Sequence, residues 1–127
     1  MSVALVDAGT DSVIPGYETM SNGITLDLRV LPTENLNIWA TLNPTIVDHV
    51  DTDLDGIEQR TEYFFPYTFP GNNGFDFYGW NFSLGSHVLT YTPYLADGTM
   101  GTPFVFNFTV IRSDIQIATP TATPGSP

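Results

Sequence analysis

The sequence predicts one all-β domain, an antiparallel β-sandwich of about seven short strands. Eleven glycines and ten prolines divide the 127 residues into short segments, and no apolar pattern keeps a helical period over three turns. The segments between these breaks are rich in β-branched and aromatic residues, and several alternate apolar with polar positions. Hydrophobic residues make up 42% of a chain of this length, which fits the core of one domain and not of two.

The first half of the chain contains four predicted strands. An apolar run at residues 3–7 ends in an Asp-Ala-Gly turn. Residues 24–30 follow an Asn-Gly turn signal and alternate aliphatic with polar side chains. Residues 36–42 place four aliphatic side chains on one face, which should be core, and Trp39 on the other face. The fourth strand is expected at residues 45–50, after a proline.

The second half continues the pattern up to the last strand. Residues 62–68 contain Pro66, which favours an edge strand or a bulge. The aromatic stretch at residues 75–82 is interpreted as a loop with a short strand, and residues 85–94 form the next strand. Residues 104–110 alternate most regularly of all. This number of strands is typical of the immunoglobulin or fibronectin type III architecture, and a closed barrel is the structural alternative.

The composition changes near the C-terminal end of the sequence. Residues 1–113 carry the strand pattern, whereas residues 114–127 form a tract dominated by threonine and proline, with no large apolar residue from Ala118 onward. Such a tract cannot add to a core, and it favours extended chain that acts as a semi-rigid spacer and accepts O-glycans. We therefore expect a sandwich module followed by a linker or tail, at an extracellular or cell-surface location.

Charge and composition exclude several classes of partner and site. Fourteen acidic residues oppose three arginines, there is no lysine, and the net charge is −11, so the basic surface that nucleic acids and anionic lipids require is missing. The chain contains no cysteine, which removes disulfides, thiolate zinc sites and cysteine nucleophiles. No apolar run approaches the roughly 20 residues of a membrane span, so direct membrane insertion is not expected.

The sequence resembles the short β-sandwich repeats of multidomain bacterial surface and secreted proteins, of the kind found beside malectin-type and polycystic-kidney-disease-type modules. The likeness covers about residues 3–111 and is clearest in Leu-Gly-Ser-His-Val-Leu-Thr at residues 84–90. It rests on residues 5–8, 10–11, 31–40, 61–62, 66–67, 70–71, 73–74, 84–90, 92–94 and 108–110. These are strand and turn positions, so the resemblance implies a fold and a surface context, and it carries no catalytic residue across.

The acidic run is the first candidate site. Asp51, Asp53 and Asp55, followed by Gly56 and by Glu62, match a D-x-D-x-D-G-x₅-E calcium loop, in which alternate carboxylates converge on one ion. The helices that flank such loops are not predicted here, because prolines lie on both sides. The sequence therefore predicts a loop or hairpin tip at this run, which either binds calcium or is a solvated acidic tip.

Aromatic residues form the second candidate site. Trp39 lies opposite the aliphatic face of its strand, and Tyr78 and Trp80 belong to the aromatic stretch that follows later in the chain. If these rings are exposed, they could stack on a sugar or on a protein partner. The alternative is a second packed layer, with Trp39 buried beneath the aromatic loop.

The sequence announces no catalytic constellation, and we predict that the module is not an enzyme. His87 lies on the inward side of its strand, so it is expected to be a hydrogen-bonded core histidine and not a catalytic base. Fourteen acids always allow some pair of carboxylates, so such a pair carries no information.

Three functions remain open after these exclusions. The first is a non-catalytic structural or adhesive module, whose partners are neighbouring domains of the same chain or surface glycans and proteins. The second is a carbohydrate-binding module, ordered by calcium. The third is a self-associating subunit of an extracellular fibre, in which edge strands such as residues 3–6 pair between copies.

Overall fold

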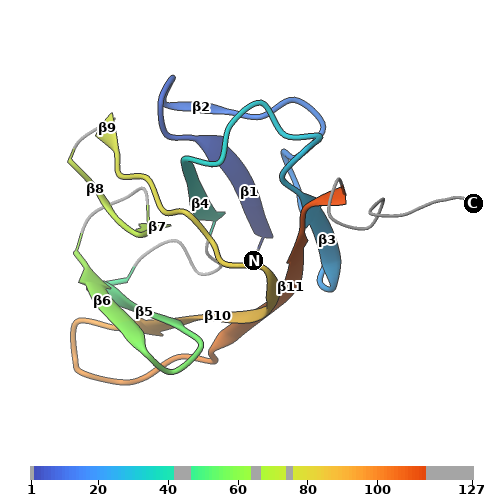
Figure 1. Cartoon of the computed structure of the whole chain (residues 1–127). Helices are drawn as coiled ribbons and strands as arrows, with labels where there is room; N and C mark the ends of the chain where they lie inside the picture. Colours follow the sequence, from blue (N-terminus) through green and yellow to red (C-terminus); the bar gives the residue numbers. More distant parts are fainter. Residues whose placement is uncertain (1, 42–46, 64–66, 74–75, 114–127) are drawn as a thin grey trace, which may run out of the picture.

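Two β-sheets face each other across a core of aliphatic and aromatic side chains (Figure 1). The structure is a computed structural model that describes residues 2–41, 47–63, 67–73 and 76–113. It confirms the predicted all-β sandwich, with two separate sheets and not a closed barrel. None of the described segments forms a helix that is long and apolar enough to cross a membrane. The predicted linker at residues 114–127 lies outside the described residues.

The smaller sheet has four strands in the order β2-β1-β4-β7. These strands are β1 (Ser2–Asp7), β2 (Ser12–Val13), β4 (Leu36–Thr41) and β7 (Tyr67–Phe69). A two-stranded hairpin of β8 (Asn72–Asn73) and β9 (Asp76–Phe77) follows β7 along the chain. The expected edge strand at residues 3–6 is therefore wrong, because β1 pairs with β4 on one side and with β2 on the other, where Leu5 and Val3 also bond to the following loop.

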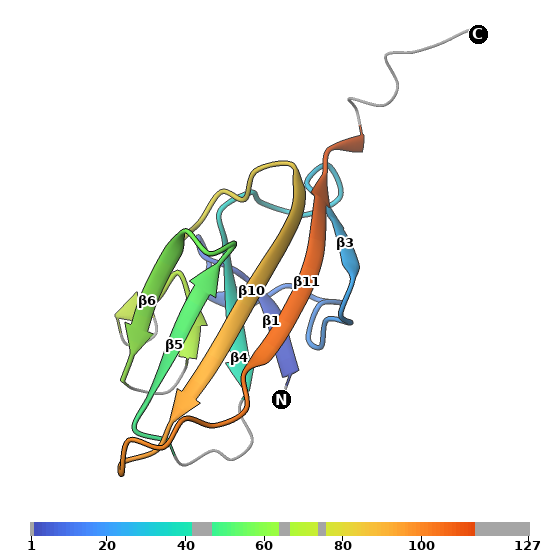
Figure 2. The same ribbon diagram turned by 90° about the horizontal axis from the view of Figure 1, so that it is seen from below.

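The larger sheet has five strands in the order β3-β11-β10-β5-β6 (Figure 2). These strands are β3 (Ile24–Asp27), β11 (Phe104–Ile111), β10 (Gly85–Tyr94), β5 (His49–Leu54) and β6 (Glu58–Glu62). All pairs are antiparallel except β3 with β11, which is parallel and corrects the purely antiparallel prediction. In this pair β3, which follows β2 of the four-stranded sheet along the chain, forms the edge of the larger sheet beside β11.

Three predicted strands have different limits in the structure. The strand expected at residues 45–50 is β5, which begins at His49 and ends at Leu54. The strand expected at residues 62–68 is two strands, because β6 ends at Glu62 in the larger sheet and β7 begins at Tyr67 in the smaller one. The strand expected at residues 24–30 ends at Asp27, whose carboxylate accepts a hydrogen bond from the Arg29 amide at 3.0 Å and closes a turn. Local alternation does not reveal these endings, since they depend on which sheet the chain joins next.

The core follows the two-residue alternation of the longest strands. Phe106, Phe108 and Val110 of β11 are buried, and so are Leu89 and Tyr91 of β10. The Tyr91 hydroxyl donates a hydrogen bond to the carbonyl of Ile38 in β4, at 3.1 Å, and so links the two sheets through the core. Burial raises the pKa of this hydroxyl, and the nearby Glu62 carboxylate adds to the rise. Tyr91 therefore stays a neutral donor that holds the sheets together.

Two valines of β11 test this arrangement. Val110 is 1% exposed and Val105 is 46% exposed, so the same truncation removes core contacts at one position and almost none at the other. Val110→Ala is expected to lower the free energy of unfolding by about 2 kcal/mol, because two methyl groups leave the core and a cavity remains. Val105→Ala should change it by less than about 0.5 kcal/mol. Urea unfolding followed by tryptophan fluorescence measures both, and equal losses would contradict the alternation.

Candidate functional site

The acidic run does not form a loop. Asp51 and Asp53 lie within β5, where they alternate with the buried side chains of Val50, Thr52 and Leu54. The run is held extended because β5 pairs with β10 on one side and with β6 on the other. The prediction of a loop or hairpin tip is therefore wrong for these two aspartates. Both carboxylates point to the outer, solvent face of the five-stranded sheet.

The remaining two predicted calcium ligands lie elsewhere. Asp55 is in the β5–β6 turn with φ of 58°, and its carboxylate accepts hydrogen bonds from the Val88 amide at 2.7 Å and from His87. Glu62 is paired with Val50, so it faces the inner side of the sheet, away from Asp51 and Asp53. The structure thus does not bring the four carboxylates together. No group of three or more metal-ligating side chains occurs among the described residues, and calcium binding stays a prediction.

Glu62 instead lies at the open edge between the two sheets. A Cβ atom added to Gly71, beside β7, would come within 3.2 Å of a Glu62 carboxylate oxygen, so the carboxylate and this backbone are in close contact. Burial raises the pKa of the Glu62 carboxyl, and the Arg60 guanidinium offsets part of this rise. The folded chain therefore holds the neutral form of Glu62 more favourably than the unfolded chain does.

Glu62→Gln should show this effect as a pH dependence of stability. A carboxyl whose pKa is raised by folding stabilises the fold below its unfolded pKa, and that contribution is lost as pH rises through the folded pKa. At pH 7 the neutral amide is therefore expected to raise the free energy of unfolding, by less than about 1 kcal/mol because the group is partly solvated. Near pH 4 the gain should shrink. Urea unfolding at both pH values measures it, with Glu58→Gln as the control in the same strand.

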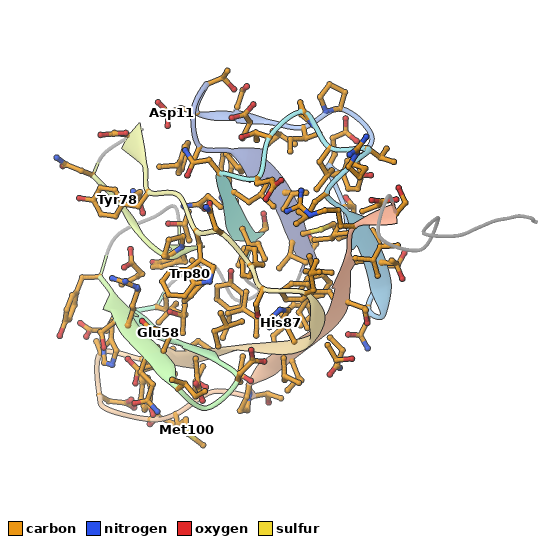
Figure 3. The ribbon with its side chains drawn as sticks, viewed as in Figure 1. Asp11, Glu58, Tyr78, Trp80, His87 and Met100 are labelled. Atoms are coloured by element: carbon orange, nitrogen blue, oxygen red, sulfur yellow. The ribbon has the colours of Figure 1, made fainter. Side chains whose placement is uncertain are left out.

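The three predicted aromatic residues do not form one exposed surface, and Figure 3 shows Tyr78 at the outside of the molecule and Trp80 nearer its centre. Trp39 stacks on Phe77 of β9, with ring centroids 5.9 Å apart and an interplanar angle of 30°. Trp80 packs against the core and meets Phe69 edge-on at 5.4 Å. Tyr78 alone among the three is 48% exposed. The arrangement of the two tryptophans agrees with the packed-layer alternative, and ligand binding at Tyr78 stays a prediction.

Asn37 holds this aromatic layer in place, a role that the sequence did not reveal. Its side chain is completely buried on the outer face of β4. The Nδ2 atom donates hydrogen bonds to the carbonyl oxygens of Gly71, at 3.0 Å, and Tyr78, at 2.9 Å. These two residues flank the β8–β9 hairpin, so Asn37 fastens both ends of the hairpin to the sheet. The only sequence signal is a polar residue beside Trp39 on the same face.

Ser83, His87 and Asp55 have the composition of a catalytic triad. His87 is buried, its Nδ1 atom lies 2.6 Å from Asp55 Oδ2, and its Nε2 atom lies 3.5 Å from Ser83 Oγ. However, Nε2 lies only 2.7 Å from the Ser83 carbonyl oxygen, which can only accept a hydrogen bond. Nε2 therefore carries a proton and cannot take one from the serine hydroxyl. The prediction of a hydrogen-bonded core histidine is confirmed.

Two variants distinguish the contribution of the His87–Asp55 contact to stability from that of the Ser83 hydroxyl. Asp55→Asn keeps the size and tolerates the left-handed backbone, but it turns one of two acceptor oxygens into a donor that faces His87 or the Val88 amide. It is expected to lower the free energy of unfolding by about 1–3 kcal/mol. Ser83→Ala should change it by less than about 0.5 kcal/mol, since the backbone carbonyl is kept. Thermal or urea unfolding measures both, and equal costs would contradict the assignment.

Comparison with known proteins supports the fold and no more. No protein-family model matches the chain, and no curated protein matches it. Among solved structures, the chain is similar to the fibronectin(III)-like modules of Clostridium thermocellum CbhA, with a TM-score of 0.50 and 23% identity. The likeness covers 74% of this chain and 93% of that one. The chain thus has a fibronectin III-like all-β sandwich fold, and the likeness does not extend to a malectin-type or polycystic-kidney-disease-type context.

Proposed function

We propose that the chain is a non-catalytic structural module that separates neighbouring parts of an extracellular protein. One observation carries this proposal: β1 begins at one end of the sandwich and β11 ends at the opposite end (Figure 2). Segments attached before and after the sandwich would therefore be held apart by its length. A fold with both connections at the same end could not separate its neighbours in this way.

Two further observations support a structural role. The buried polar side chains that resemble catalytic or binding groups are engaged in holding the fold, since His87 bonds to Asp55 and Ser83, and Asn37 bonds to the β8–β9 hairpin. The threonine- and proline-rich tract at residues 114–127 supports an extracellular address and a linker to a further domain. The likeness of the sequence to repeats of bacterial surface proteins agrees with this context.

The spacer proposal is tested by measuring the distance between the two ends. The chain has no cysteine, so Ser2→Cys and Ser113→Cys can be spin-labelled without background. Pulsed electron resonance should give one narrow distance distribution, unchanged by added salt or calcium, because a packed sandwich fixes both positions. Urea should broaden it. A broad distribution under native conditions would contradict a rigid spacer.

A kinetic control tests the non-catalytic part of the proposal. Hydrolysis of p-nitrophenyl acetate by the chain should equal that of the Ser83→Ala variant, because the His87 ring cannot activate the hydroxyl. Turnover that disappears in Ser83→Ala would show that the triad is active and would overturn this part.

A further inference from the structure

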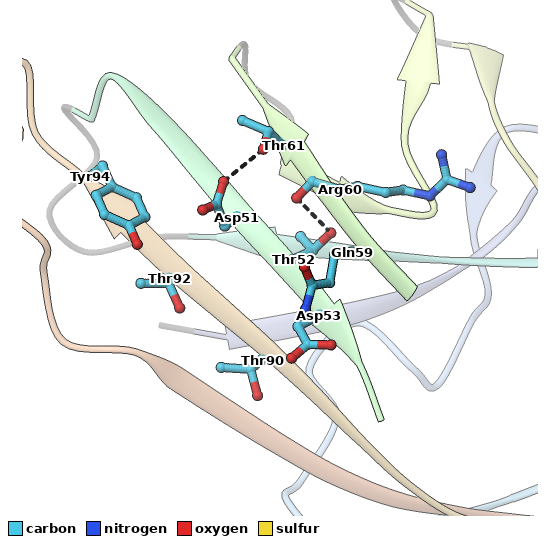
Figure 4. Close-up of a pocket in the computed structure, with 9 residues that line it drawn as sticks. All are labelled: Asp51, Thr52, Asp53, Gln59, Arg60, Thr61, Thr90, Thr92 and Tyr94. Atoms are coloured by element: carbon cyan, nitrogen blue, oxygen red, sulfur yellow. Dashed lines mark hydrogen bonds between the residues drawn. The ribbon is translucent and has the colours of Figure 1, made fainter. Parts of the chain in front are cut away.

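A shallow groove crosses the outer face of β10, β5 and β6 (Figure 4). The strand register places its polar side chains in two rows, each with a carboxylate in the middle. The first row is Thr92, Asp51 and Thr61, and the second is Thr90, Asp53 and Gln59. All six point outward because the alternate residues of β5 are buried. The groove has a volume of about 480 Å³.

An aromatic row lies at one end of these polar rows. His49 pairs with Tyr94 across β5 and β10, and their rings stack with centroids 4.7 Å apart and an interplanar angle of 13°. Tyr63, directly after β6, lies on the other side of His49 at 5.5 Å. Tyr63 is 60% exposed, although a tyrosine ring of this size contributes most when it is covered. The groove therefore runs from a polar floor to an exposed aromatic edge.

The carboxylates of the groove keep acceptor capacity. Asp51 Oδ1 accepts a hydrogen bond from the Thr61 hydroxyl at 2.8 Å. Asp53 Oδ1 is buried and accepts no hydrogen bond from any residue that the structure describes. The Arg60 guanidinium is directed away from the groove, as Figure 4 shows. That oxygen is out of reach of a ligand, but each carboxylate has a second oxygen, so a ligand that brings hydroxyl donors would still find acceptors in the groove.

We propose that this groove binds a neutral polysaccharide. Sugar hydroxyls donate to Asp51 and Asp53 and exchange hydrogen bonds with the threonines, while the apolar face of a sugar ring packs on Tyr63. A net charge of −11 and the two carboxylates disfavour an anionic ligand. Calcium fits less well, because the two aspartates are alternate residues of an extended strand, about 7 Å apart, and no third carboxylate from the described part of the chain joins them.

This site goes beyond the spacer function and differs from the aromatic site predicted from the sequence. It lies on the outer face of the five-stranded sheet, whereas Trp39 and Tyr78 lie on the side of the four-stranded sheet that carries the β8–β9 hairpin. An open groove across three strands accepts a chain that continues past both ends, which suits a polymer better than a small enclosed ligand.

Affinity electrophoresis in native gels tests the proposal. The gels contain hydroxyethylcellulose, xylan, galactomannan or laminarin, and the migration of the whole chain is compared with that in a gel without polysaccharide. At least one polysaccharide should retard it. Asp53→Ala is expected to weaken binding about tenfold, through loss of charge-assisted hydrogen bonds. Tyr63→Ala should weaken it at least about fivefold, and as an exposed substitution it keeps the test valid if Asp53→Ala does not fold.

Matched variants on other surfaces serve as controls. Asp76→Ala removes the same carboxylate from β9, and Tyr78→Ala removes a comparably exposed tyrosine, so both should bind like the parent chain. Retardation that survives both groove variants but is lost in Tyr78→Ala would move the site to the hairpin and overturn the proposal.

Two further outcomes would also overturn it. Absence of retardation in all four gels would exclude the polysaccharide and leave the spacer function untouched, since that rests on the end-to-end distance. The second outcome comes from calorimetry, in which calcium chloride alone is titrated into the protein and the heat of binding is measured. Heat of binding that Asp53→Ala abolishes, together with unretarded migration, would identify the groove as a cation site.

Discussion

The two-residue period of extended chain, kept in register across β6, β5 and β10, is the constraint on which this molecule depends. Once Val50, Thr52, Leu54, Leu89 and Tyr91 are buried against the opposite sheet, the residues that alternate with them can only lie on the outer face. A shift of one residue in β5 would bring Asp51 and Asp53 into the core at a cost of several kcal/mol each. The register that buries the core side chains therefore also decides which side chains form the polar rows of the outer face.

Polar groups inside the sandwich form hydrogen bonds that connect segments far apart in the sequence. Tyr91 joins the two sheets through Ile38, and Asn37 holds the hairpin that covers β4. His87 ties the β5–β6 turn to the segment before β10, with an acceptor at each ring nitrogen. Nε2 faces a carbonyl oxygen that can only accept a hydrogen bond, so the side chain that most resembles a general base does not offer this nitrogen as an acceptor to the Ser83 hydroxyl. The hydrogen bonds of His87 at this site therefore hold the fold together.

The sequence predicts those features that local alternation determines. The number of short strand-like segments was sufficient to predict the sandwich, and the alternation of β10 was sufficient to predict the inward position of His87. Asp51 and Asp53 were misassigned to a loop because D-x-D-x-D satisfies both a calcium loop and the period of a strand, and aspartate is rare in strands. The choice is made by pairing with β10, nearly 40 residues later, as in Thr90 with Asp53. No local pattern contains that information.

Aromatic rings on the two outer faces of the sandwich differ in how far neighbouring side chains cover them. On the smaller sheet, Trp39 is covered by Phe77 of the β8–β9 hairpin, so the ring stabilises the fold itself. On the larger sheet, Tyr63, Val88 and Val105 are at least 40% exposed, and the two polar rows that contain Asp51 and Asp53 lie beside Tyr63. Packing explains the position of Trp39 on the first face but gives no reason for an exposed tyrosine next to two carboxylates on the second. A ligand that pairs a ring face with hydroxyl groups supplies that reason, because it would use both features at once.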